Sequence, residues 1–317
     1  MINNYQESLI THSTYQYIFT VFTPSYNRAH TLHRVFESLK AQTFRDFEWL
    51  IVDDGSTDNT IEIVNRWQEE NIFPIHYIHQ KKQGKHIAFN LAVKEAKGEL
   101  FLNLDSDDAC LPNALERFKY HWDKISVDEK DRFSAVTCLC KDEDDKIVGD
   151  CFPYDVTDSD SIELFYKLKI RGEKWGFHRT DVLKKFPFPE IQNQDYCPEG
   201  IIWSQISKIY KTRFVNEALR IYFKGTDQLT KSSSPKKHAL GHIISAKYTL
   251  NEEINYFKYS PLAFIRSSAN YSRFSFHQNV PVSKQLKDLS IPFSKFLLLI
   301  TLPLGYLLFT KDRIFFN

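Results

Sequence analysis

Three aspartates follow directly on an apolar run and lie within four positions of one another. Residues 101–110 read Phe-Leu-Asn-Leu-Asp-Ser-Asp-Asp-Ala-Cys, which places Asp105, Asp107 and Asp108 together. Carboxylates this close resist being ionised at the same time unless a cation neutralises them. Aspartate oxygens are hard ligands that suit Mg²⁺ or Mn²⁺. The cluster therefore predicts a place where a divalent metal meets an anion such as a nucleotide diphosphate, with a solvated acidic turn as the alternative.

The elements that must position these aspartates alternate along the first hundred residues. Apolar runs rich in β-branched and aromatic residues predict strands, and apolar residues at helical spacing predict helices between them. This order is typical of an α/β fold with a mostly parallel sheet covered by helices on both faces. The strands are expected at 17–23, 47–52, 75–78 and 99–104, and the helices at 29–41, around 61–67 and at 86–97.

Polar residues follow three of these strands. Tyr26 and Asn27 come after the first, Asp53 and Asp54 after the second, and the aspartate cluster after the fourth. In such sheets, ligands bind beyond the carboxyl ends of the strands. We therefore expect the three groups to converge on one edge of the sheet.

Charge is distributed unevenly over the 317 residues, although the net charge is only +1. Residues 231–317 hold 12 Lys or Arg against 4 Asp or Glu, whereas residues 1–230 hold 29 against 36. The overall balance argues against nucleic acid as a partner. The basic C-terminal part is expected to face something anionic, such as a membrane surface.

The cysteines and the N-terminus favour the cytoplasm. Five cysteines form an odd set without a CxxC pair, which predicts reduced thiols rather than a disulfide framework or a zinc site. Residues 1–17 are polar and lack the apolar core of a signal peptide.

The motifs together resemble the family 2 glycosyltransferases of the GT-A fold. The resemblance rests on Phe-Thr-Pro-Ser-Tyr-Asn at 22–27, Gln-Thr-Phe at 42–44, Glu-Trp-Leu-Ile-Val-Asp-Asp-Gly-Ser-Thr-Asp at 48–58 and Leu-Asp-Ser-Asp-Asp at 104–108. It implies an inverting sugar transferase with a nucleotide-activated donor and a divalent metal, Mn²⁺ or Mg²⁺. The implied domains are a polar tail at 1–16, a GT-A catalytic domain at 17–228 and a basic helical extension at 229–317.

The resemblance also implies the donor site. Tyr26 would stack on the base, unless it is a core tyrosine. Asp54, with Asp53 beside it, would accept the uracil imide N–H, which favours UDP over CDP; helix capping is the alternative. Asp107 and Asp108 would supply the metal and ribose ligands, with Asp105 in support. The remaining donor-binding candidates are Pro24, Arg28, Lys85 and His86.

Inversion requires a carboxylate base on the sugar face opposite the leaving group. By resemblance the candidate is Glu199, although Gly200 stands where the family has an aspartate. Glu199 could instead complement a helix N-terminus, and Asp195 is the second candidate. Lys174, Trp175, Gly176 and Phe177 could shape the sugar pocket or belong to the core.

The expected function is transfer of a single sugar, since the Gln-x-x-Arg-Trp motif of resembling processive synthases is absent. The donor is expected to be a UDP-sugar and the acceptor a glycan or a lipid-linked glycan of surface polysaccharide. Two alternatives stay open. A non-catalytic nucleotide-sugar-binding or scaffold protein would explain the imperfect base motif, and a nucleotidyltransferase would share the α/β sheet and metal but normally has a glycine-rich phosphate loop.

Residues 296–309 form an uncharged apolar segment. As a helix it would be about 21 Å long, shorter than the roughly 30 Å hydrocarbon core of a bilayer, and Pro303 and Gly305 would weaken it. Lys295, Lys311 and Arg313 flank it. We expect a shallow anchor that places the protein peripherally on the cytoplasmic face of a membrane. A helix packed on the protein, or a dimer contact, is the alternative.

Overall fold

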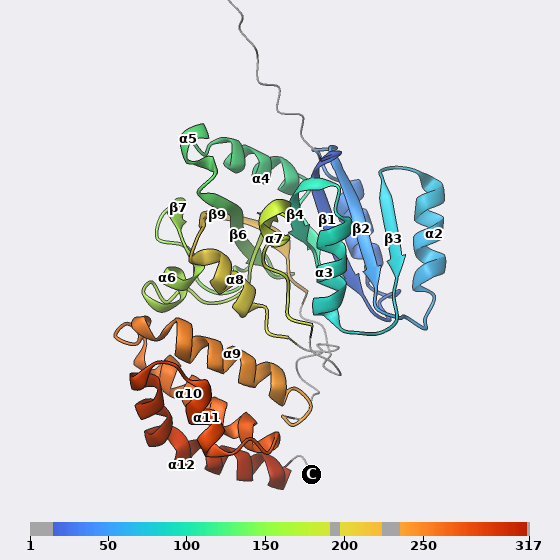
Figure 1. The fold of residues 1–317 in the computed structure, drawn as a ribbon. Coiled ribbons are helices and arrows are strands. Elements are labelled where there is room, and N and C mark those ends of the chain that lie inside the picture. Colours follow the sequence, from blue (N-terminus) through green and yellow to red (C-terminus); the bar gives the residue numbers. More distant parts are fainter. Residues whose placement is uncertain (1–14, 191–196, 224–234, 316–317) are drawn as a thin grey trace, which may run out of the picture.

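A computed structural model describes residues 15–190, 197–223 and 235–315 (Figure 1). The strands are β1 (Tyr17–Ser25), β2 (Phe47–Asp53), β3 (Ile75–His79), β4 (Gly98–Asn103), β5 (Ala109–Cys110), β6 (Phe133–Lys141), β7 (Val156–Ser159), β8 (Lys174–Arg179) and β9 (Lys211–Ile221). The helices before residue 210 are α1 (Leu32–Lys40), α2 (Thr60–Glu70), α3 (Lys85–Glu95), α4 (Ala114–Asp123), α5 (Val127–Lys130), α6 (Ser161–Tyr166), α7 (Thr180–Leu183) and α8 (Gly200–Ser207). The later helices are α9 (Ala239–Glu252), α10 (Pro261–His277), α11 (Val282–Asp288) and α12 (Pro292–Phe315).

One sheet runs through the molecule in the order β3-β2-β1-β4-β8-β6-β9-β5, with β7 paired to β9. The neighbours from β3 to β4 are all parallel, as the alternation of strands and helices predicts. Beyond β4 the sheet is mixed, because β8 runs antiparallel to both β4 and β6. The α/β fold class with a C-terminal helical extension is therefore confirmed, and its parallel part is the half that carries the aspartate cluster.

The strands alternate their side chains between two apolar layers, because successive residues of a strand point to opposite faces. In β2, Trp49 and Ile51 pack with α1, α2 and α4, while Leu50 and Val52 pack with α3, α7 and α8. Both faces of the sheet are thus covered by helices. This burial fixes where each strand ends, and so it fixes the edge at which the polar groups meet.

The helices α9–α12 gather at the end of the molecule below α6 and α8 (Figure 1). Their core includes Ile162 and Tyr166 of α6, which join them to the sheet domain. The boundary expected at 228/229 lies outside the described residues, but the helical extension itself is present from Ala239 onward.

The apolar segment predicted at 296–309 belongs to a longer helix than expected, since α12 has 24 residues and continues through Pro303 and Gly305. A helix of that length spans about 36 Å. A side chain at Gly305 would place its Cβ 2.6 Å from Cβ of Ser272, so glycine is what allows α10 to pack this closely on α12. By length and composition alone, α12 is the one helix in the described part of the chain that could cross a membrane.

Candidate active site

The ends of β1, β2 and β4 lie side by side at one edge of the sheet. Ser25 is paired with Asp53 across β1 and β2, and Phe22 is paired with Asn103 across β1 and β4. The chain leaves this edge three times through polar residues, as the sequence predicts. The structure therefore brings Tyr26, Asp53 and the aspartate cluster to the same edge.

Asp53 and Asp54 shape the loops that surround this edge. Asp53 accepts hydrogen bonds from the Ser56 backbone N–H at 2.8 Å and from the Tyr77 hydroxyl at 2.6 Å. Burial and this carboxylate together raise the pKa of Tyr77 well above its usual range. The side chain of Asp53 thus fixes the turn after β2.

Asp54 organises the loop that leads into α3. Its carboxylate accepts from the Gln80 side chain at 2.7 Å and from the backbone N–H groups of Gln83 and Gly84, both at 2.8 Å. Gly84 is the N-cap of α3 and has a φ of 101°. These three donors occupy three of the four lone-pair positions of the Asp54 carboxylate and leave one.

Tyr26 follows β1 and is half-buried, with the Lys82 ammonium 3.5 Å from the centre of its ring. The next residue, Asn27, adopts a φ of 54° and accepts the Thr57 N–H at 2.7 Å through its side chain. Pro24 is half-buried within β1 opposite Val52. The end of β1 is therefore bound to the loop after β2, which sets the orientation of the tyrosine ring.

Lys85 joins the aspartate cluster to the candidate base. It is the first residue of α3, and its ammonium lies 3.0 Å from Asp105 Oδ1 and 3.0 Å from Glu199 Oε1. Burial opposes the charge on Lys85, but the two carboxylates outweigh it and raise its pKa above the usual range. Glu199 is the N-cap of α8, and its side chain makes no capping hydrogen bond there. Glu199 therefore stands at the N-terminus of α8, as the helix-terminus alternative expects, while its side chain contacts Lys85. Asp195, the second candidate, lies outside the described residues.

Asp108 and Asp105 share a cation that the sequence analysis did not predict. Arg220 of β9 donates from Nε to Asp108 Oδ2 at 2.8 Å and from Nη2 to the same oxygen, and Nη2 also reaches Asp105 Oδ2 at 3.2 Å. The Phe223 backbone N–H donates to the other Asp108 oxygen at 3.0 Å. Burial raises the pKa of Asp108 to about 6, against the opposing effect of Arg220. Burial would also raise the pKa of Asp105, but Lys85 and Arg220 hold it well below its usual range.

Arg220 is buried, with 5% of its surface exposed. The only sequence signal for it is a lone arginine between Leu219 and Ile221, which the structure places in β9. An arginine removed from water in a strand requires a carboxylate partner, and Asp108 is 112 positions away. That pairing explains why Asp108 is almost fully buried.

Replacing Arg220 by Gln is expected to lower the free energy of unfolding by about 3–5 kcal/mol, because it leaves the Asp108 carboxylate buried without its cation. Adding Asp108→Asn to the same chain should restore part of that loss. Arg132→Gln is the control, since Arg132 pairs with Glu129 at the exposed surface and should cost less than about 1 kcal/mol. Urea unfolding of the wild type, these three variants and Asp108→Asn alone measures this, and additive losses from the Arg220 and Asp108 changes would contradict the coupling.

Unlike Asp105 and Asp108, Asp107 makes no short ion pair. Its side chain is 31% exposed and its nearest ion pair is a 3.9 Å contact with Arg28 Nη2. Arg34 donates to its backbone carbonyl at 3.0 Å and lies 4.2 Å over the Phe223 ring, which fixes the main chain here. Asp107 is therefore the one carboxylate of the cluster that no short ion pair engages, and within residues 15–190, 197–223 and 235–315 no three His, Cys, Asp or Glu side chains gather to hold a metal ion. Asp108 fits a cation less well, since Arg220 and the Phe223 N–H occupy its oxygens.

The other predicted residues differ in how deeply their side chains are buried. Arg28 reaches the site edge through its contact with Asp107, whereas His86 lies inside α3 and is 3% exposed. Phe177 and Trp175 are core residues, which is the second of the two alternatives given for them by the sequence. Trp175 instead donates its indole N–H to the Asn103 carbonyl at 2.5 Å, which supports the end of β4.

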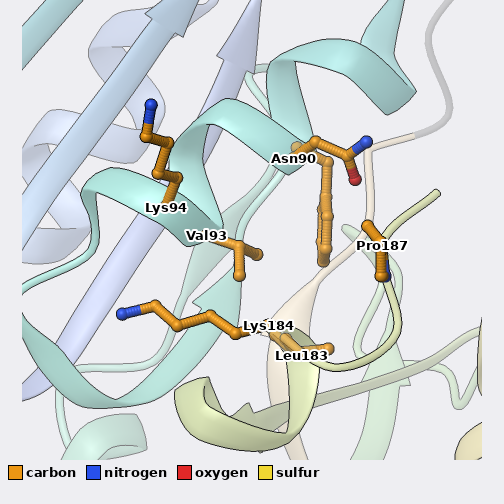
Figure 2. A pocket seen from close by; sticks show the side chains of 7 residues that line it. Asn90, Val93, Lys94, Leu183, Lys184 and Pro187 are labelled. Atoms are coloured by element: carbon orange, nitrogen blue, oxygen red, sulfur yellow. The ribbon is translucent and has the colours of Figure 1, made fainter. Parts of the chain in front are cut away.

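A hollow of about 370 Å³ lies elsewhere, between α3 and the segment from α7 to Pro187 (Figure 2). Figure 2 shows Asn90, Val93 and Lys94 on one side and Leu183, Lys184 and Pro187 on the other. No residue of the predicted site lines this hollow. The candidate site at the strand ends is thus separate from this hollow.

Solved structures show which class of protein has this fold. Staphylococcus aureus TarS 1–349 in complex with UDP-GlcNAc is similar over 92% of this chain and 91% of that one, with a TM-score of 0.63 and 19% identity. The mannosyltransferase PcManGT from Pyrobaculum calidifontis, in complex with GDP-Man and Mn²⁺, covers 95% of this chain and 85% of that one, with a TM-score of 0.51 and 18% identity. The fold is that of the GT-A glycosyltransferases.

Sequence comparison finds similarity to one family over part of the chain. Residues 20–128 match the model of glycosyl transferase family 2. An uncharacterized glycosyltransferase from Nostoc is 42% identical over 98 residues, which are 31% of this chain and 30% of that protein. The GalNAc(5)-diNAcBac-PP-undecaprenol beta-1,3-glucosyltransferase of Campylobacter jejuni is 25% identical over 285 residues, 86% of this chain and 88% of that protein. The chain spans less than a third of the Nostoc relative and most of the Campylobacter one. Residues 20–128 thus resemble glycosyl transferase family 2, and the fold around them is of the GT-A type.

Proposed function

We propose that this glycosyltransferase moves one sugar from a UDP-sugar to a hydroxyl of a glycan or lipid-linked acceptor, with inversion, in surface polysaccharide assembly. The observation that carries the proposal is the Lys85 bridge, because it places the Glu199 carboxylate beside the aspartate cluster at the strand ends. Inversion needs a base across the donor sugar from the leaving diphosphate, and the Lys85 contacts support a candidate base and the aspartate cluster as parts of one site.

Hydrogen-bond acceptors and positively charged side chains at the strand ends support the proposal that a UDP-sugar binds there. Asp54 has one acceptor position left for the uracil imide, and the Tyr26 ring at the end of β1 offers a face for the base. Lys85 and Arg28 stand where a diphosphate would need positive charge. Asp107 would hold Mn²⁺ or Mg²⁺, which when bound neutralises charge that develops on the leaving diphosphate. Asp105 and Asp108, with Arg220, support the loop that presents Asp107.

The proposed reaction needs few parts of the chain. Glu199 takes the proton from the acceptor hydroxyl as its oxygen attacks the anomeric carbon. The bond from that carbon to the diphosphate oxygen breaks, and the nucleoside diphosphate leaves with the electron pair. Attack from the face opposite the leaving group inverts the configuration.

The acceptor class and the location are proposed from a relative and from the C-terminal charge. The name of the Campylobacter relative includes a polyprenyl-diphosphate-linked acceptor. A lipid-linked acceptor requires an enzyme at a membrane surface, and the extension from residue 231 onward carries a net charge of +8. We therefore propose a peripheral position on the cytoplasmic face of a membrane.

Thermal-shift binding tests the donor site. UDP and UDP-sugars should raise the melting temperature by several degrees in the presence of Mn²⁺, because a ligand that binds only the folded chain stabilises it by mass action. GDP and CDP should shift it less, and EDTA should remove the metal-dependent part. Equal shifts for all three nucleotides would contradict the assignment of Asp54, and no shift from any of them would overturn the donor site.

A further inference from the structure

Helix α12 turns its large apolar side chains away from the protein. Phe296, Ile300 and Leu307 are 58%, 58% and 62% exposed. Phe293, Leu304 and Ile314 continue this pattern, since neighbouring members of the set are three, four or seven residues apart. That spacing places all six side chains on one side of the helix over its whole length. An exposed apolar stripe of this length marks an interaction surface.

The opposite side of α12 is anchored to the protein through small and polar residues. Thr301 bonds Ser268 of α10 at 2.7 Å, and Gly305 packs against Ser272 and Ala269. Asp312 is buried and accepts from Arg273 Nε at 2.6 Å and from Nη2 at 2.5 Å. These contacts fix the rotation of the helix, so the apolar stripe cannot turn inward.

The charge around the stripe is positive. The four acidic side chains of the extension are held by partners within the protein: Asp312 by Arg273, Glu253 by the Tyr166 hydroxyl, Glu252 by Lys208 and Asp288 by Lys247. Lys311 and Arg313 at the end of α12 are exposed. A second copy of the chain would bring two positive surfaces together, whereas an anionic bilayer complements both the apolar stripe and the basic residues. We infer that α12 docks on an anionic lipid bilayer.

The geometry favours a helix that lies flat in the interface rather than one that crosses the bilayer. Leu297 and Leu298 form one core with Leu250, Phe264 and Tyr271. A spanning α12 would leave this core, and it would separate Asp312 from Arg273, which strands two charges. A flat α12 keeps these contacts and buries only the outward stripe. This deepens the proposed location, but it does not depend on sugar transfer, since lipid binding is measured without donor or acceptor.

Vesicle flotation with the full chain tests the inference. Vesicles of phosphatidylglycerol and phosphatidylcholine should carry the protein upward, and the triple variant Phe296→Ser, Ile300→Gln, Leu307→Gln should bind at least tenfold more weakly. The control is Val127→Gln with Ile209→Gln, which removes exposed apolar side chains far from α12 along the chain and should bind like the wild type. Unchanged melting temperatures would show that both variants fold, as expected for exposed positions.

Two further experiments test whether the stripe binds lipid or a second copy of the chain, and whether α12 lies flat or spans the bilayer. Lys311→Gln with Arg313→Gln should weaken binding to the phosphatidylglycerol vesicles by roughly tenfold and leave binding to pure phosphatidylcholine unchanged. Alkaline carbonate should release the wild-type chain from vesicles, and retention would overturn the flat orientation. Absence of binding to either vesicle overturns the inference, as does equal binding by the triple variant. A dimer that the triple variant dissociates, without vesicle binding, would assign the stripe to a second copy.

Discussion

Asp107→Asn is expected to lower kcat/KM by about a thousandfold in the presence of Mn²⁺. Of the three clustered aspartates, Asp107 alone keeps its carboxylate oxygens out of a short ion pair, since Arg28 is 3.9 Å away. A bound divalent ion contributes several kcal/mol of charge stabilisation, and about 1.4 kcal/mol corresponds to a factor of ten. The asparagine retains the shape and loses the charge, so the metal-dependent part of turnover should disappear.

The control for this variant is Asp144→Asn, which removes an exposed carboxylate in the turn after β6. It should match the wild type in turnover and in Mn²⁺ dependence. Titration of Mn²⁺ against initial rate, together with the thermal shift caused by UDP, separates loss of the metal from loss of the donor. An Asp107→Asn enzyme that keeps the full Mn²⁺ response would assign the metal to Asp105 or Asp108 and contradict the present assignment.

The first half of the fold is predicted well because its signals are local. The expected strand at 47–52 and the observed β2 differ by one residue, since a run of this length that is apolar except for Glu48 is buried on both faces. The short strands β5 and β7 are missed. They contain two and four residues, and half of β7 is exposed, so neither has an apolar period to detect. The antiparallel direction of β8 is also not encoded in its own pattern, because it depends on which strands lie beside it.

The site is predicted in its position and only partly in its contacts. The sequence places Asp54 and the aspartate cluster at strand ends, and the sheet register brings them to one edge. It does not show that Asp108 is held by Arg220, because the two lie 112 positions apart. It also does not show that Asp54 binds the loop before α3. Asp107 and Asp108 belong to one motif, yet they can differ in role. The oxygens of Asp108 already accept from Arg220 and the Phe223 N–H, whereas Asp107 makes no short ion pair.

The Lys85 bridge links the two halves of the site. In the described structure its ammonium is shared between Asp105 and Glu199, at 3.0 Å from each. A diphosphate near Lys85 would compete for the same ammonium, since it is a stronger anion than one carboxylate. Donor binding would then release Glu199 toward the acceptor. The base and the donor site are therefore expected to respond differently to substitution, which allows their roles to be measured separately.

Glu199→Gln is expected to lower kcat by about 10²–10⁴-fold, the usual contribution of a general base, while UDP affinity stays within a few-fold of the wild type. The amide cannot accept the acceptor proton, yet it keeps the size of the side chain and leaves Asp105 in contact with Lys85. Glu173→Gln, an exposed change before β8, is the matched control and should leave both quantities unchanged. Initial rates and UDP thermal shifts on the same preparations measure the two effects.

The comparison of the two active-site variants is more decisive than either alone. Asp107→Asn should lose the metal-dependent part of UDP binding together with turnover, whereas Glu199→Gln should lose turnover only. If Glu199→Gln instead keeps full turnover, the proton acceptor lies elsewhere, and Asp195 is then the carboxylate to replace. If it loses UDP binding as well, the Lys85 bridge acts in donor binding rather than in positioning the base. Only loss of turnover with retained donor binding is consistent with Glu199 as the group that accepts the proton.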